Sequence, residues 1–546
     1  MASDATTTTG SILAGGRVDG GPGPADPAQP SSAVAGGRPS AEKSGELAGR
    51  RLAGLAGGVA LAGMILASLA IVGITAARPS ILSPPSLIEF PRWMAGPLGW
   101  IGRPVKLGQN GLKLTLSLAV GGMFVAYLTV LACVRRLRAG WVIGSIVGLH
   151  VIFVLSPPLS LTDAFNYLNY GRLEALHGLN PYTTIPALGP TSDPTFYLSN
   201  WHQLLSPYGP LFTIFSFVLV PLGVAGGFWA LKASLMIASL ATLWLVWRCA
   251  ELVDRDPLKA TAFVGLNPLV LVWGLGGDHN DFFMVFLVML ACYLLLRARA
   301  VRAGLEPPPA AAAGGGGGQA SRRTRLVAFL DGGPRPRPGE AGPAWELGAG
   351  FALVAAVAIK ASAGILLPVV LLGATRRFRL LGGMLAAVVV FGGASILAFG
   401  PHLPNLAQQS TLVTLAGLPN VVGSIIGLGG ETDSMKTALA GLLVLGAVLG
   451  AVWSWRTRRW IEASGFVTLV LLVTLSWALP WYVLWLLPLA GLARGRGLRV
   501  AALVVSVYLL VIWMPNMTAV IHALHYKPSL TRLGQERQQK TLLLLH

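Results

Sequence analysis

The chain has 546 residues, of which 54% are hydrophobic and only 12% are charged, and its mean hydropathy is +0.65. An ordinary soluble domain carries about a quarter charged residues, so this composition excludes a soluble enzyme. The formal net charge of +19 does not indicate a nucleic-acid partner, because the basic residues stand in short clusters between apolar runs, as the positive-inside pattern of membrane proteins requires. The clusters are Arg50-Arg51, Arg135 to Arg138, Arg376 to Arg379, Arg456 to Arg459 and Arg494 to Arg496.

Residues 1–50 are rich in Thr, Gly, Pro and Ala and contain no apolar core. We therefore expect a disordered cytoplasmic tail with no cleavable signal peptide. After residue 50, apolar stretches of about 17 to 25 residues follow one another, and each is long enough to cross a bilayer. The candidate spans are 51–76, 112–133, 139–157, 208–224, 227–248, 258–275, 282–297, 345–374, 381–399, 437–454, 461–479, 481–493 and 499–515.

These stretches predict an all-α fold, a polytopic membrane helical bundle of about 13 spans, or about 14 if residues 345–374 form a broken pair. That segment is long for one span and contains Lys360 near its middle and Pro368 beyond, which favours a break. The predicted parts in chain order are a tail at 1–50, an N-terminal membrane part at 51–299 with an external loop at 158–207, a low-complexity linker at 300–343, a C-terminal membrane part at 344–515 with an external loop at 400–435, and a polar tail at 516–546.

The basic clusters set the expected orientation. With Arg50-Arg51 and Arg135 to Arg138 inside, the third span delivers the 158–207 loop, with short interfacial helices, to the outer face. Four ordinary spans from 208 to 297 would then place the arginines at 297–302 outside, against their charge. We favour the explanation that one helix between 208 and 248 does not fully cross, since 208–224 is short and interrupted by Gly and Pro.

A polar and aromatic segment follows the third span. In a helix, Asp163, Asn166, Tyr167 and Tyr170 recur at i, i+3, i+4 and i+7 and share one face, whereas Arg172 lies off that face. A carboxylate at the mouth of a membrane cavity can serve as a general base, although the same Asp also suits a plain helix cap. Further along, Asn180, Tyr182 and Tyr208 stand among Pro and Gly residues, a composition that permits a sugar site.

A second polar cluster, Asp278 to Asp281, separates two apolar runs and contains His279 and Asn280. Three potential ligands within four residues give poor geometry for one metal ion, so we favour contact with a phosphate or a sugar. The third feature is Lys360, which must snorkel, face a polar cavity or meet an anion such as a lipid phosphate. For Lys232 and His150, which lie nearer the ends of apolar runs, snorkelling or a helix–helix hydrogen bond is the expected role.

Together these motifs resemble a known family. Asp163 follows an early span, Asn-Pro-Tyr and Ser-Pro-Tyr-Gly-Pro come next, and then Asn267-Pro268 precede the Asp-His-Asn-Asp turn and a lysine-bearing broken helix. Their order and spacing, from about residue 50 to 515, resemble the actinobacterial polyprenyl-phosphomannose-dependent alpha-(1,6)-mannosyltransferases of the GT-C superfamily.

The resemblance implies a multi-pass enzyme of the bacterial plasma membrane that moves mannose from a polyprenyl-phosphate donor to an acceptor glycan or glycolipid on the extracytoplasmic face. It implies Asp163 as the catalytic base. Arg172, His279 and Lys360 are then candidates for binding the donor phosphate, and no metal or soluble cofactor is required. The candidate sugar-binding residues are Asn166, Tyr167, Tyr170, Asn180, Tyr182, Tyr208, Asp278, Asn280 and Asp281.

Other functions stay open at this point. A transporter or flippase of lipid-linked glycans would share the membrane topology, but such proteins usually show internal repeats and mid-membrane ionisable residues, and the repeats are not visible here. A ligase that moves a preassembled glycan, or a GT-C enzyme that uses another lipid-linked sugar, would use similar external loops.

Overall fold

The computed structural model describes residues 40–77, 91–159, 163–302, 344–414, 417–517, 523 and 531–545. Most of the predicted tail and most of the 300–343 linker therefore lie outside the described residues. Residues Arg50–His546 form one compact unit, separate from Met1–Gly49, and the description below concerns that unit.

All regular elements in the described residues are helices, which confirms the all-α prediction. The longer helices are α1 (Ser40–Ala76), α3 (Gln109–Cys133), α4 (Ala139–Leu155), α5 (Asp163–His177), α6 (Pro210–Leu219), α7 (Gly223–Leu252), α8 (Pro257–Gly265), α9 (Asp281–Arg302), α11 (Ala344–Ile359), α12 (Leu366–Gly373), α13 (Arg377–Phe399), α15 (Leu418–Ile425), α16 (Asp433–Thr457), α17 (Trp460–Thr474), α19 (Arg496–Trp513) and α21 (Arg532–Leu545). The short ones are α2 (Arg92–Ala95), η1 (Gly99–Gly102), η2 (Val134–Arg136), η3 (Pro186–Leu188), η4 (Val220–Leu222), η5 (Leu269–Leu275), η6 (Ala361–Ile365), α14 (Leu406–Ser410), η7 (Pro480–Trp485) and α18 (Leu487–Leu492).

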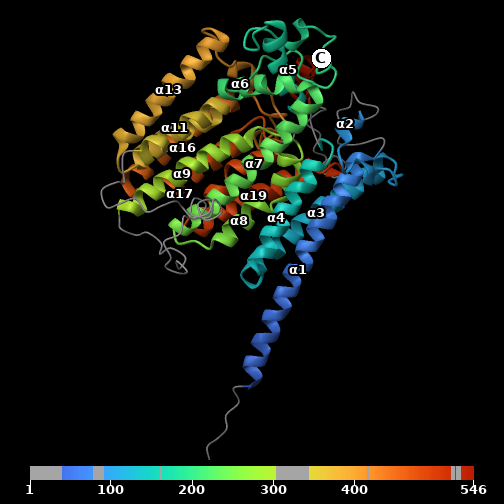
Figure 1. Ribbon diagram of the computed structural model, residues 1–546, viewed down its shortest axis with the longest axis vertical. Coiled ribbons are helices and arrows are strands. Elements are labelled where there is room, and N and C mark those ends of the chain that lie inside the picture. Colours follow the sequence, from blue (N-terminus) through green and yellow to red (C-terminus); the bar gives the residue numbers. More distant parts are fainter. Residues whose placement is uncertain are drawn as a thin grey trace, which may run out of the picture. The chain divides into compact units, whose positions relative to one another are not determined.

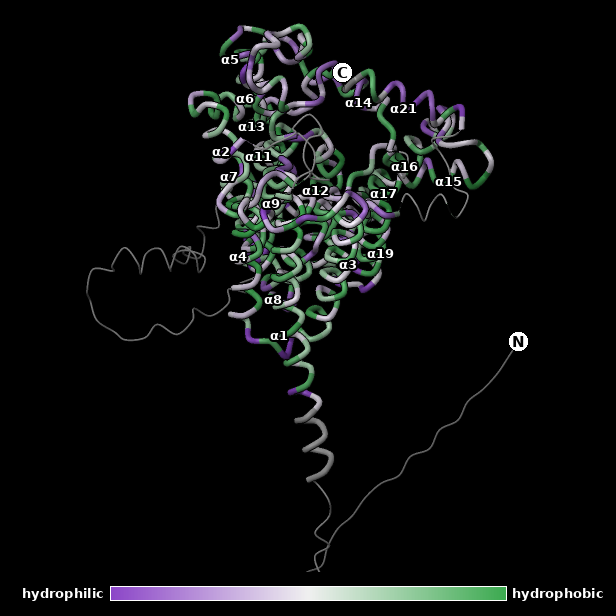
Figure 2. The backbone as a smooth tube through the Cα atoms, turned by 90° about the vertical axis from the view of Figure 1, so that its right-hand side faces the viewer, coloured by the Kyte–Doolittle hydropathy of each residue, from purple (hydrophilic) through white to green (hydrophobic). Residues whose placement is uncertain are grey.

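Seven helical runs of the described chain are long and apolar enough to cross a membrane, or eight if α8 and η5, which meet at 48°, make one bent span. The polytopic membrane fold is therefore confirmed. The number is below the predicted thirteen because several candidate spans form shorter apolar helices that end at a break or at Pro and Gly residues. In Figure 2 the tube through α3, α8 and α19 is largely hydrophobic, and hydrophilic residues gather along α21.

The length of α6 agrees with the expectation that one helix between 208 and 248 does not fully cross the bilayer. This helix has only 10 residues, so it rises about 15 Å, half of the roughly 30 Å of a bilayer core. Its chain continues through η4 to Gly223, whose φ of +68° allows the backbone to turn into α7. Helix α6 alone is too short to cross, and residues 210–252 together count as one candidate span.

The basic clusters lie at one end of the bundle. Arg51, Arg136 and Arg138 line one pocket, and Arg458 after α16 donates to the carbonyl of Ala374 before α13 (2.8 Å). At the same end, Arg135 forms an ion pair with Asp256 beyond α7 (3.1 Å), and Arg302 at the end of α9 forms one with Glu346 of α11. Because α9 begins at Asp281 and ends at Arg302, the 276–281 turn lies at the opposite end of the bundle. Figure 1 shows α5 and α6 at this second end.

The predicted break in 345–374 is confirmed, and it lies at Lys360. Helix α11 ends at Ile359, Lys360 is extended with a φ of −150°, and the chain resumes as η6 and α12. The carbonyl of Ile359 that the break exposes accepts a hydrogen bond from the backbone N–H of Gly209 (3.0 Å). The break therefore attaches to the start of α6, and it presents Lys360 at the cavity end of the bundle.

Helix α11 packs between α9 and α13 (Figure 1), and its contact with α13 depends on glycine. A Cβ on Gly383 of α13 would collide with the carbonyl oxygen of Leu347, and a Cβ on Gly350 of α11 would collide with that of Leu380. These two glycines allow the helix backbones to approach closely, as small residues do in membrane helix pairs.

We expect Gly383→Ala to lower the stability of the protein by about 1–3 kcal/mol, because the added methyl forces the two backbones apart. Thermal unfolding in detergent measures the effect. Gly392→Ala on the same helix is the matched control, since a Cβ there meets nothing within 4 Å. Equal unfolding temperatures for the two variants would contradict the close approach.

Candidate active site

A cavity opens at the end of the bundle opposite the basic clusters. Its volume is about 1710 Å³, counting its open mouth. Helix α5, the 200–208 segment, the break at 360–362, α14 with residue 412, the 475–485 segment and Trp513 contribute its walls. The walls are rich in tyrosine and tryptophan, with Asp163 and Lys360 as the charged residues among those that line it.

Asp163 begins α5 and faces this cavity with 16% of its side chain exposed. Its Oδ2 lies 3.1 Å from Nδ1 of His279, whose ring is 1% exposed and stacks on Trp481 at a centroid distance of 3.4 Å. The histidine is therefore not part of the cavity wall. Since a residue that binds the donor phosphate has to lie on that wall, His279 does not suit this role. It lies behind the carboxylate and orients it.

Lys360 occupies another part of the wall and pairs with Asp281. Its Nζ lies 2.9 Å from both carboxylate oxygens, and Trp485 Nε1 donates to the same carboxylate at 2.5 Å. The ammonium also lies over the rings of Tyr482 and Trp485, at 4.8 and 5.3 Å. Lys360 keeps 19% of its side chain exposed, whereas Asp281 is 1% exposed, so the lysine, and not the aspartate, faces the cavity.

The tyrosines of α5 complete this part of the site. Tyr167 packs edge to face against Tyr208 at 4.8 Å, and its Oη accepts a hydrogen bond from the backbone N–H of Asn280 (3.4 Å), which ties α5 to the 276–281 turn. Burial, and then the nearby Asp163 and Asp281 carboxylates, raise the pKa of Tyr167 well above its ordinary value. The phenol therefore stays protonated.

Arg172 lies away from the cavity. Its Nε contacts both oxygens of Asp193 at 3.0 Å, and His177 contacts the same carboxylate at 3.2 Å. Burial alone would raise the pKa of Asp193, but hydrogen bonds from Arg172, Thr195 and His177 hold it below its usual value. This arginine fixes the loop that follows α5, so we do not retain it as a phosphate ligand.

Three residues that we predicted to bind sugar also fix this loop. Asn166 donates to the side chain of Asn200 (3.0 Å), Asn180 donates to the carbonyl of Phe399 (2.7 Å), and the Tyr182 hydroxyl donates to the carbonyl of Tyr208 (2.9 Å). They hold the cavity wall in place from behind.

The 276–281 turn is almost completely buried. Asp278 forms an ion pair with Lys232 of α7 at 3.3 Å, and the side chains of His279 and Asn280 are buried. The expectation that Lys232 snorkels or joins a helix–helix hydrogen bond is therefore wrong, since its side chain has no exposed surface and its partner is a turn carboxylate. For His150 the helix–helix hydrogen bond is confirmed, with Nε2 2.8 Å from Ser239 Oγ. No cluster of three or more metal-binding side chains occurs in the described part of the chain.

Of the predicted site residues, Asp163, Tyr167, Tyr170, Tyr208 and Lys360 line the cavity together. The prediction missed Trp481, Tyr482 and Trp485, because we assigned 481–493 to a span. The signal was present in the sequence, since a proline followed by three large amphipathic rings within five residues is unusual for a lipid-facing helix.

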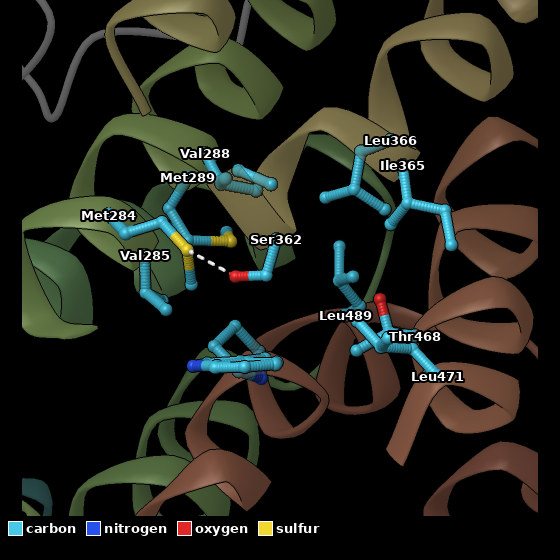
Figure 3. Close-up of a pocket in the computed structure, with 13 residues that line it drawn as sticks. Met284, Val285, Val288, Met289, Ser362, Ile365, Leu366, Thr468, Leu471 and Leu489 are labelled. Atoms are coloured by element: carbon cyan, nitrogen blue, oxygen red, sulfur yellow. Dashed lines mark hydrogen bonds between the residues drawn. The ribbon is translucent and has the colours of Figure 1, made fainter. Parts of the chain in front are cut away.

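A second, apolar pocket of about 390 Å³ adjoins the cavity (Figure 3). Its lining is mostly apolar, as Met284, Val288 and Leu366 in Figure 3 show. Helices α9, η6, α12, α17 and α18 contribute its walls. Ser362 and Trp485 line both spaces, so the pocket adjoins the part of the cavity wall that contains Lys360.

Comparison with known proteins identifies relatives of this arrangement. A family model described as "Alpha-(1->6)-mannopyranosyltransferase, N-terminal domain" matches residues 55–376, and one described as "MptB C-terminal domain" matches residues 412–526. The chain is 26% identical to alpha-(1->6)-mannopyranosyltransferase A of Mycobacterium tuberculosis over 74% of its own length and 77% of the relative's. It is 24% identical to the protein of the same name from Corynebacterium glutamicum, covering 62% and 68%. No solved structure matches the chain.

Proposed function

This chain belongs to the alpha-(1->6)-mannopyranosyltransferase family and is a membrane mannosyltransferase, and we propose that it moves mannose from a polyprenyl-phosphate donor to an acceptor glycan in α-(1→6) linkage. The observation that carries the proposal is a single cavity with a carboxylate, Asp163, on one wall and an ammonium, Lys360, on another, above an apolar pocket.

The reaction is a direct displacement. The acceptor hydroxyl oxygen forms a bond to C1 of mannose and gives its proton to Asp163, while the bond between C1 and the phosphate oxygen breaks and its electron pair leaves with the polyprenyl phosphate. The configuration at C1 inverts, so a β-linked donor yields an α-linked product. Asp163 suits the role of base because His279 fixes one of its oxygens and the cavity admits the acceptor to the other.

Lys360 supplies the positive charge for the leaving phosphate. Its ammonium has three N–H groups, and Asp281 engages the side turned away from the cavity. A charge-assisted hydrogen bond to a phosphate oxygen strengthens as negative charge develops there, which stabilises the transition state.

The apolar pocket supports a lipid donor. Since Ser362 and Trp485 border both spaces, a phosphate at Lys360 has apolar side chains of α9 and α12 nearby, which suit the start of a lipid chain. Trp201 and Trp477, which lie edge to face at 5.9 Å, also line the cavity together with Gln409, and aromatic rings combined with hydrogen-bonding groups suit the acceptor sugar.

The face of the membrane follows from charge. The basic clusters gather at the end opposite the cavity, and Lys and Arg collect on the cytoplasmic side of short loops. We therefore place the cavity on the extracytoplasmic face of the bacterial plasma membrane.

We expect Asp163→Asn to lose transfer by at least about 10²-fold, because the amide keeps the shape of the carboxylate but accepts no proton. Purified protein incubated with labelled polyprenyl-phosphomannose and a short α-mannoside measures the lengthened product. Glu174→Gln, on the same helix and outside the cavity lining, is the control and should transfer at nearly the wild-type rate. A wild-type rate in Asp163→Asn would show that the base is another group.

The phosphate role of Lys360 needs a paired variant. Lys360→Met alone leaves Asp281 buried without its charge partner, which is costly in itself. We expect Lys360→Met combined with Asp281→Asn to recover the unfolding temperature while kcat/KM for the donor stays about tenfold to hundredfold below wild type, the worth of a charged hydrogen bond. Wild-type kcat/KM in the folded double variant would mean that the pair is only structural.

For the membrane face, we expect an impermeant thiol reagent on intact cells to label Ser192→Cys and to spare Thr457→Cys, in a background where Cys133 is replaced by Ala. Ser192 is exposed in the loop beside the cavity and Thr457 is exposed in the basic end. Labelling of Thr457→Cys alone would reverse the orientation.

A further inference from the structure

The 276–281 turn holds a charge pair that the proposed mechanism does not use. Lys232 of α7 and Asp278 of the turn lie 3.3 Å apart, and their side chains are 0% and 1% exposed. No hydrogen bond from another described residue reaches the Asp278 carboxylate, so the ammonium of Lys232 is its closest compensating group in that part of the chain. Two charges enclosed among membrane helices are rare, and where they occur they mark functional sites.

Asp278 also has an unusual backbone conformation. Its φ is +60°, a region that side-chain-bearing residues rarely adopt, and its backbone N–H donates to the carbonyl of Leu275 (3.2 Å). A turn in this conformation persists only when its surroundings hold it. The next residue is His279, which contacts the proposed base, so any relaxation at Asp278 would displace His279.

Lys232 is also linked to α5, the helix that carries Asp163, through an aromatic residue of its own helix. Its ammonium lies over the rings of Phe228 and Trp229, at 5.4 and 5.7 Å. Phe228 in turn stacks on Phe165 of α5 at 5.3 Å with an angle of 13°. One side chain therefore fixes His279 through Asp278, and it fixes the start of α5 through Phe228.

We propose that Lys232 is a positioning residue for the transfer reaction: its ion pair with Asp278 holds the turn so that His279 meets Asp163 in the reactive geometry. The proposal deepens the function given above and rests on Asp163 being the base. It assigns Asp278 a role behind the site, in place of the sugar contact expected from the sequence. A displacement of about 1 Å in a reacting group costs on the order of 10²-fold in rate, so a loose turn should lower kcat and leave substrate binding nearly unchanged.

The test uses the full chain in detergent with Lys232→Met, Asp278→Asn and the double variant. Ser239→Ala is the matched control, because Ser239 is also buried on α7 and joins another helix through His150 without touching the turn. Two readouts are taken: hydrogen–deuterium exchange of the peptide that covers the 276–281 turn, which does not depend on activity, and kcat and KM for both substrates.

We expect Lys232→Met to speed exchange in the turn and to lower kcat by about tenfold or more with little change in either KM, whereas Ser239→Ala does neither. If Lys232→Met does not fold, the double variant, which leaves no unpaired charge, should fold and show the same loss of kcat. Unchanged exchange in the turn, or a loosened turn with wild-type kcat, would overturn the proposal. If Lys232→Met speeds exchange in the turn as expected but the wild-type enzyme does not use polyprenyl-phosphomannose, the role of Lys232 in holding the turn is supported and the proposed donor is wrong.

Discussion

The ion pair between Lys360 and Asp281 is the interaction on which the rest of the site depends. An unpaired charge among membrane helices is costly, so the lysine at the end of α11 and the aspartate at the start of α9 must meet. The pair forms where α11 stops, since Lys360 directly follows the last helical residue, Ile359, and has an extended backbone. The same carboxylate accepts from Trp485, which brings η7 to the cavity. The break at Lys360, the ion pair and the aromatic residues of η7 therefore meet at the carboxylate of Asp281.

The 276–281 turn contains a second buried ion pair, between Asp278 and Lys232. Its two carboxylates point to different helices, Asp281 to the break at Lys360 and Asp278 to Lys232 of α7, and the histidine between them points to Asp163. The three ionisable side chains have separate partners, so the turn connects α5, α7 and the break that follows α11. The turn holds these helices in position and does not form a surface for substrate. Its glycines allow the chain to fold that tightly.

Local features of the site could be predicted from the sequence, and remote partners could not. The shared face of Asp163, Tyr167 and Tyr170 follows from helical spacing, and the shortness of α6 follows from its Gly and Pro residues. Arg172 was expected to bind phosphate because nothing in the sequence pairs it with Asp193, and Lys232 was expected to snorkel or to bond to another helix because Asp278 lies far along the chain. Hydropathy likewise places Trp481 in a span, since it reports burial without saying whether lipid or a cavity lies alongside.

The ion pair between Arg302 and Glu346 has a consequence for how the protein can be assembled. It joins the last described residue before 303–343 to the beginning of α11, so the two ends of that segment are held together by contacts outside it. Helix α11 also packs against α9 along its length. The parts of the chain up to residue 302 and from residue 344 onward therefore contact each other independently of the covalent connection, and these contacts would favour their association if they were expressed as two separate chains. A reporter or an affinity handle inserted between them would leave the cavity untouched at the other end of the bundle.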